Sequence, residues 1–148
     1  MLSRPRNGWT HFKILDSKEY SLSNVYDDIA FDWTERAILG LESNCPFCVS
    51  GWMEPFEFYC TVSDYYCFII TDEEEDEEIS DDYVDGEEYS MQVFHIKKED
   101  FCRALVEDLE RNLSAWDDFG WGSIRRRQDK DRCGELRRRI QRIKELIE

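Results

Sequence analysis

The feature that most limits how this chain can fold is a run of acidic residues at positions 72–88. Twelve of these 17 residues are Asp or Glu, and none is basic. Like charges at this density repel one another, so the run cannot fold on itself or enter a hydrophobic core. We therefore expect an extended, solvated loop between two ordered parts of the chain, which becomes ordered only against a cationic surface.

Strand patterns lie on both sides of the acidic run. Residues 56–62 and 66–71 are rich in aromatic and β-branched side chains, and the intervening Ser63 and Asp64 suit a turn, so these segments predict a β-hairpin. Residues 89–96 predict a third strand. The apolar pattern leaves two choices for its core side, which are Met91, Val93 and His95 or else Ser90, Gln92, Phe94 and Ile96.

Three segments show the periodicity of amphipathic helices. Apolar residues recur every three or four positions over residues 24–42, 98–116 and about 134–148. A short strand is also expected at residues 10–15. This order of elements fits the α+β class better than a βαβ alternation. We expect one domain over residues 1–148, in which an antiparallel sheet of three to four strands packs against about three helices.

The charge of the chain limits its partners. Asp and Glu number 34 against 19 Lys and Arg, which gives a formal net charge of −15 and excludes free nucleic acid as a general partner. The basic residues gather in residues 121–148, beside a stripe of Leu and Ile. Such a stripe is typical of a helix that packs on the body of the protein. Its arginines are expected to pair with the acidic body, or the stripe to form a homodimer.

The N-terminal residues, the lack of long apolar segments and the cysteines indicate the cellular compartment of the protein. The first nine residues lack the apolar stretch of a secretory signal, and no window approaches the roughly 18 to 20 apolar residues that cross a bilayer. We therefore expect a cytoplasmic protein with no membrane partner. Because the cytosol keeps thiols reduced, we expect no disulfides among the six cysteines.

No catalytic motif occurs in the chain. The sequence has no nucleophile elbow, zinc-protease motif or phosphate-binding loop, so we expect neither enzymatic activity nor a cofactor. Cys45 and Cys48 form a CxxC motif, and Cys60 and Cys67 follow it. Four thiolates can hold zinc, but the second pair falls inside predicted strands and lacks the spacing of a second zinc knuckle, so we expect no metal and leave zinc as an open question.

Several parts of the chain resemble bacterial immunity proteins, which neutralise polymorphic or contact-dependent toxins. These parts are residues 27–33, Gly51 and Trp52, the acidic run, and residues 94–101, within a small acidic chain rich in tryptophan. The resemblance implies a one-to-one inhibitor of a cognate toxin. Such a toxin is often a nuclease, whose basic groove is occluded by carboxylates.

The resemblance and the charge together predict an acidic, aromatic-framed surface that binds a basic protein toxin. Carboxylates speed the encounter with a basic groove, and desolvated rings such as Trp52, Trp116 or Trp121 slow release. The alternative is an acidic mimic of nucleic acid, or an adaptor, that binds host enzymes or regulators. The residues expected at the interface are Asp72, Glu73, Glu74, Glu75, Asp76, Asp81, Asp82, Tyr83, Asp85, Trp52, Asp117, Asp118 and Trp121.

Overall fold

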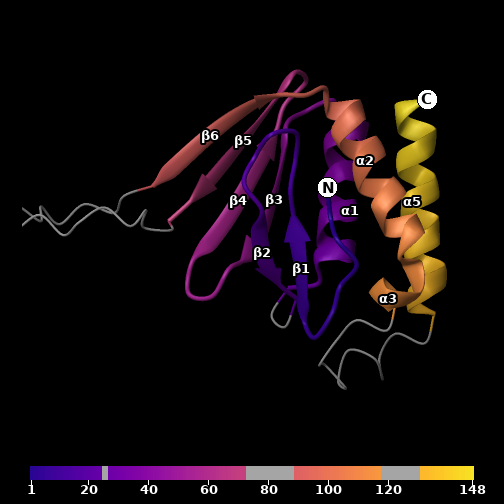
Figure 1. Ribbon diagram of the computed structural model, residues 1–148. Coiled ribbons are helices and arrows are strands. Elements are labelled where there is room, and N and C mark those ends of the chain that lie inside the picture. Colours follow the sequence, from indigo (N-terminus) through magenta and orange to yellow (C-terminus); the bar gives the residue numbers. More distant parts are fainter. Residues whose placement is uncertain (25–26, 73–88, 118–130) are drawn as a thin grey trace, which may run out of the picture.

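The computed structural model describes residues 1–24, 27–72, 89–117 and 131–148 (Figure 1). In chain order the described elements are β1 (Trp9–Phe12), β2 (Tyr20–Ser23), α1 (Ile29–Glu42), β3 (Phe47–Trp52), β4 (Glu57–Val62), β5 (Tyr66–Thr71), β6 (Ser90–His95), α2 (Lys98–Arg111), α3 (Leu113–Asp117) and α5 (Arg132–Ile147).

The six strands form one antiparallel sheet in the order β1-β2-β3-β4-β5-β6, which curls into a half-barrel. The fold is α+β, but the prediction of a three- to four-stranded sheet with about three helices was wrong, because the described residues contain six strands and four helices. Sequence reasoning missed β2 and β3. Strand β2 has only four residues, and Gly51 in β3 suggested a turn. Glycine fits there closely, because a Cβ would lie 3.0 Å from the Leu22 side chain, which would have to shift.

A cluster of aromatic rings explains the curvature of the sheet. Phe12 on β1 and Phe58 on β4 are three strands apart, or about 14 Å along a flat sheet, yet their ring centroids are 5.2 Å apart. Trp33 of α1 lies 5.5 Å from Phe12, and its indole N–H donates to the Ser50 carbonyl at 2.8 Å. Tyr20 of β2 joins the cluster and hydrogen-bonds Gln92 of β6 at 3.4 Å. The rings therefore fill the concave side of the half-barrel.

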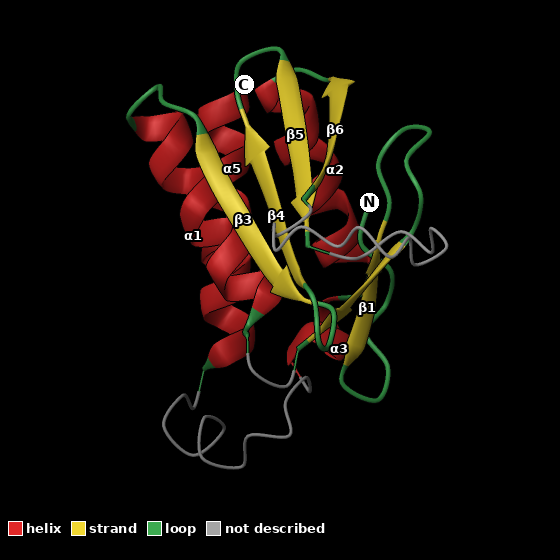
Figure 2. Ribbon diagram, turned by 90° about the vertical axis from the view of Figure 1, so that its left-hand side faces the viewer, coloured by secondary structure: helices red, strands yellow, loops and turns green. Residues whose placement is uncertain are grey.

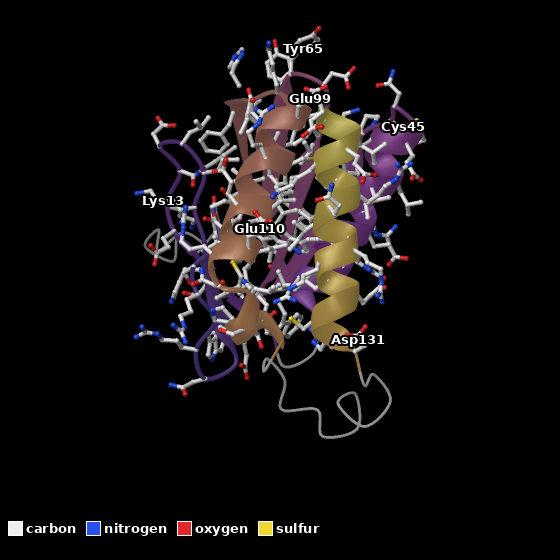
Figure 3. The ribbon with its side chains drawn as sticks, turned by 90° about the vertical axis from the view of Figure 1, so that its right-hand side faces the viewer. Lys13, Cys45, Tyr65, Glu99, Glu110 and Asp131 are labelled. Carbon is white, nitrogen blue, oxygen red and sulfur yellow. The ribbon has the colours of Figure 1, made fainter. Side chains whose placement is uncertain are left out.

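The described helices lie on this same side of the sheet (Figures 1 and 2). Phe101 of α2 packs edge-on against Phe47 of β3, with 6.0 Å between ring centroids. The α5 stripe Leu136, Ile140 and Ile143 is buried in the same core. In Figure 3, α2 and α5 lie side by side and run in opposite directions. The apolar stripe of the basic helix α5 thus packs against the core of its own chain.

Ionic contacts fix α5 against α1. Arg132 donates to both carboxylate oxygens of Asp28, one of them at 2.7 Å, and its guanidinium lies 4.1 Å from the centroid of the Phe31 ring. Arg139 donates to the Phe31 carbonyl at 2.9 Å. The side chains of Arg132 and Asp28 are only 11% and 14% exposed. Because each partner compensates the other's buried charge, removal of either one leaves an unpaired charge and is costly.

Two predicted helices have different bounds in the structure. The segment expected at residues 98–116 is divided at Asn112, whose amide donates to the Asp108 carbonyl at 3.3 Å. Such local bonding competes with the helical ladder. The helix expected from residue 24 begins at Ile29, after Asp28, whose carboxylate pairs with Arg132 and makes no cap.

In β6, Ser90, Gln92 and Phe94 are the more buried set, which decides between the two choices for its core side.

Gly40 in α1 makes a close approach that predicts the effect of a substitution. A Cβ at this position would lie 2.5 Å from Cδ1 and 2.9 Å from Cβ of Phe47 on β3. Alanine gains about 1 kcal/mol in helix propensity over glycine, but overpacking costs about 1–3 kcal/mol. Because both contacts are under 3.0 Å, and one is to Cβ rather than to a flexible side-chain end, the cost falls in the upper part of that range, about 2–3 kcal/mol. We therefore expect Gly40→Ala to lower the free energy of unfolding in urea by about 1–2 kcal/mol. The exposed neighbour offers a control, since Leu39→Ala should change it by less than about 0.5 kcal/mol. A Gly40→Ala variant as stable as the wild type would contradict the packing of α1 on β3.

Candidate functional site

The convex side of strands β3 to β6 forms the candidate site, which we call the open face. No described helix covers it, and Figure 2 shows its strands in front of the helices. Along each strand, buried residues alternate with residues that point outward. The outward residues of the open face are Cys48, Ser50, Trp52, Glu57, Tyr59, Thr61, Tyr66, Phe68, Ile70, Met91, Val93 and His95.

The centre of the open face is apolar. The register places Tyr59, Ile70 and Met91 side by side on β4, β5 and β6, and Phe68 beside Val93. Met91 is 63% exposed and Val93 is 46% exposed. Contiguous apolar surface of this kind is typical of a protein-binding site, whereas scattered single residues are not.

A pocket of about 680 Å³ lies at one end of the open face. It opens where β3 turns into β4, and Trp52 and Tyr59 lie on its walls. The described residues that line it are Asp27, Ser50, Gly51, Trp52, Glu54, Pro55, Glu57 and Tyr59. Three carboxylates and two aromatic rings therefore line one pocket, and neither Lys nor Arg is among these lining residues.

Two hydrogen bonds, one to its carboxylate and one from its backbone, position Glu57 at this pocket. The Tyr59 hydroxyl donates to Glu57 Oε2 at 2.8 Å, and the backbone N–H of Glu57 donates to Asp72 Oδ1 at 2.6 Å. The bond to Glu57 raises the pKa of the Tyr59 phenol, and desolvation and the charges of Glu57 and Asp72 add to the effect. The pocket is thus electronegative and has no described cation to balance it.

The helical side of the protein differs, because its cations are paired. Arg142 Nη2 lies 2.9 Å from Glu42 Oε1, and Lys144 Nζ lies 2.6 Å from Glu110 Oε1. Hydrogen bonds from Arg139 and then Arg138 lower the pKa of Glu135. Five of the six basic residues of α5 therefore pair with carboxylates, while the carboxylates of the pocket stay available to a partner.

The structure brings together two of the residues expected at the interface. Trp52 pairs with Glu57 across β3 and β4, and Asp72 accepts the hydrogen bond from Glu57, so Trp52 and Asp72 lie at the same end of the sheet. Asp117 ends α3. Trp116 cannot serve as an interface ring, because it is completely buried in the core. The expected interface residues outside the described ranges are Glu73, Glu74, Glu75, Asp76, Asp81, Asp82, Tyr83, Asp85, Asp118 and Trp121.

Of the eight described lining residues, only Trp52 was predicted at the interface, and the acidic and aromatic ones that sequence reasoning left out are Asp27, Glu54, Glu57 and Tyr59. The alternation in residues 56–62 already puts Glu57 and Tyr59 on one face of a strand, and that signal was available. Asp27 and Glu54 carry no such signal. They reach the pocket only because of how the chain enters α1 and how β3 turns into β4.

The four cysteines considered as zinc ligands do not converge. Cys60 and Cys67 are buried on the concave side of the sheet, Cys48 is exposed on the open face, and Cys45 is exposed just before β3. Within the described ranges, no group of three or more His, Cys, Asp or Glu side chains is placed to hold a metal ion. Burial raises the pKa of the Cys102 thiol to about 12, which suits core packing.

Comparisons with known proteins found no match for this chain. No protein-family model matches the chain, and neither a curated protein nor a solved structure matches it. In the part of the chain that the structure describes, every helix is too short or too polar to span a membrane.

The contact between Tyr59 and Glu57 predicts a measurable titration. We expect Glu57→Gln to lower the pKa of Tyr59 toward its ordinary value of 10.0, because the charged acceptor that favours the protonated phenol is removed. The ¹³Cζ chemical shift of Tyr59, followed by NMR above neutral pH, reports this value. Glu54→Gln is the matched control, since it removes a charge from the same pocket without removing the hydrogen bond. An unchanged pKa in Glu57→Gln would exclude the contact.

Proposed function

We propose that this protein is an immunity protein that binds a basic protein toxin through the open face and blocks its action in the cytoplasm. The observation that carries the proposal is the chemistry of that face, which has an apolar centre on β4 to β6 and an electronegative pocket at one end. An apolar core with a polar rim is the usual anatomy of a protein–protein interface.

Charge supports a basic partner. The chain has a net charge of −15, and described basic residues of α5 are already paired on the helical side. Opposite charges can raise association rates to about 10⁸ M⁻¹s⁻¹ or more at low salt. Asp72, the first residue of the acidic run, lies at the end of the sheet that holds the pocket, and its carboxylate adds to the negative charge there. Fast capture suits a protein that must neutralise a toxin before it acts.

The open face favours a toxin over the alternative partner class, the enzymes and regulators bound by a nucleic-acid mimic. A mimic requires many carboxylates spaced like phosphates. Of the outward residues on β3 to β6, only Glu57 is a carboxylate, and most of the others are apolar or aromatic. Such a surface selects one partner by shape as well as by charge.

Two substitutions with equal charge separate the open face from the rest of the surface. Val93→Lys places a cation at the centre of the open face, and Leu39→Lys places one on the exposed side of α1, where Leu39 is 53% exposed. Both variants have the same net charge, and both positions are exposed enough to accept lysine without unfolding the protein. We expect Val93→Lys to weaken binding of the toxin by at least about tenfold, or about 1.4 kcal/mol, because the lysine is desolvated against a basic surface.

The measurement begins with capture of a basic protein from source cells by the tagged wild-type chain. The captured protein is then expressed alone and with each variant, and its dissociation constants are measured by calorimetry. The proposal requires that the captured protein arrest growth, and that the wild type and Leu39→Lys relieve the arrest at one-to-one stoichiometry better than Val93→Lys does. A harmless captured protein, or equal relief by both variants, would overturn the proposal.

A further inference from the structure

We propose that the pocket between Trp52 and Tyr59 binds a single arginine side chain of the partner. This inference deepens the proposed function and rests on it for the identity of the partner, although the pocket can be tested alone. Its volume of about 680 Å³ is within the usual range of about 300–1,000 Å³ for ligand pockets. It can therefore take a long side chain together with its flanking backbone.

The two rings are placed to hold a planar cation. Trp52 lies directly opposite Glu57, and Tyr59 lies opposite Ser50, so Trp52 and Tyr59 are diagonal neighbours on one face of β3 and β4. Diagonal neighbours in an antiparallel pair have side chains about 7–8 Å apart. This separation leaves room for a flat group between two rings. A guanidinium is flat, and it stacks on aromatic faces with favourable cation–π energy.

The carboxylates supply the complementary charge. Asp27, Glu54 and Glu57 line the pocket and come from three places in the chain, which are the segment before α1, the β3–β4 turn and β4. Glu57 uses one oxygen for the Tyr59 hydroxyl at 2.8 Å, so its other oxygen can accept from a guest. A guanidinium has five N–H donors in a fixed fork, which suits bidentate pairing with one carboxylate and leaves donors for further acceptors.

The groups that line the pocket disfavour a compact cation. Among the described residues, no three potential metal ligands lie close enough together to hold one ion. A metal ion needs several ligands within about 2.0–2.6 Å of one point. A lysine ammonium is also a point charge, so it lacks the planar face that stacks on rings and the fork that pairs with a carboxylate through two bonds. The arrangement therefore selects arginine over both.

Backbone contacts hold the walls of the pocket in place before binding. The Ser50 carbonyl accepts from the Trp33 indole at 2.8 Å, which anchors β3 two residues before Trp52. The Met53 N–H donates to the Phe56 carbonyl at 2.6 Å and closes the β3–β4 turn. The Glu57 N–H donates to Asp72. A site that is already ordered loses less conformational entropy when it binds.

The test uses three short peptides and the full-length protein. The probes are acetyl-Gly-Arg-Gly-amide, the same peptide with neutral citrulline in place of arginine, and the same peptide with lysine. Binding is followed by NMR through the indole N–H shift of Trp52. We expect the arginine peptide to bind at least about tenfold more tightly than either of the others, since only it combines stacking with charge-assisted bidentate bonds.

Two variants with equal charge locate the site. Glu57→Gln should weaken the arginine peptide by at least about fivefold, because one charge-assisted acceptor is lost. Glu99→Gln removes the same charge from the exposed start of α2, on the far side of the molecule (Figure 3), and should leave binding unchanged. Equal binding of arginine and citrulline, equal binding of arginine and lysine, or equal loss in both variants would each overturn the inference.

The peptide result and the toxin result can fail separately. If Val93→Lys weakens a growth-arresting partner while the peptides show no preference for arginine, the pocket inference is wrong and the proposed function stands. If the peptides show the preference while the captured protein is harmless, the proposed function is wrong and the arginine pocket stands.

Discussion

The contact of Phe12, Trp33 and Phe58 is the packing on which the rest of this structure depends. These rings join β1, α1 and β4, with centroid distances of 5.2 to 6.3 Å, and they draw strands three positions apart toward one centre. Because side chains alternate along a strand, burial of Phe58 and Cys60 on one side sends Glu57 and Tyr59 to the other. The core therefore decides which residues the open face presents.

The helical side and the open face also differ in how their charged residues are paired. On the helical side, α5 supplies cations that pair with Asp28, Glu42 and Glu110, so acidic and basic side chains stabilise the fold together. On the open face, the carboxylates of the pocket lie beside rings and have no described cation as a neighbour. Solubility alone does not require acidic residues to lie around Trp52 and Tyr59 in a pocket. This asymmetry is the physical reason for proposing a basic partner.

Segments whose apolar residues recur with a clear strand or helix period could be predicted from the sequence, and segments without such a period could not. The strand at residues 66–71 and the helix at the C-terminus follow directly from their patterns. In contrast, β2 is too short to carry a pattern, and β3 contains Gly51, which suggested a turn and packs closely against Leu22. Asn112 divides a helix whose apolar spacing runs on past it. For the site, Trp52 and Asp72 were predicted and lie together, but the pocket also needs Asp27 and Glu54, which only the tertiary fold brings to it. Local periodicity cannot report such distant contacts.

Hydroxyl-radical footprinting of the complex with the proposed toxin tests the central claim most directly, because it compares the open face and the helical face in one experiment. The account predicts that the complex protects Trp52, Tyr59 and Met91 from oxidation by at least about fivefold relative to the free protein, since contact at an interface excludes water from these side chains. Leu39, on the exposed side of α1, should be oxidised at the same rate in both states. Protection of Leu39 with unchanged oxidation of Trp52 and Met91 would contradict the account.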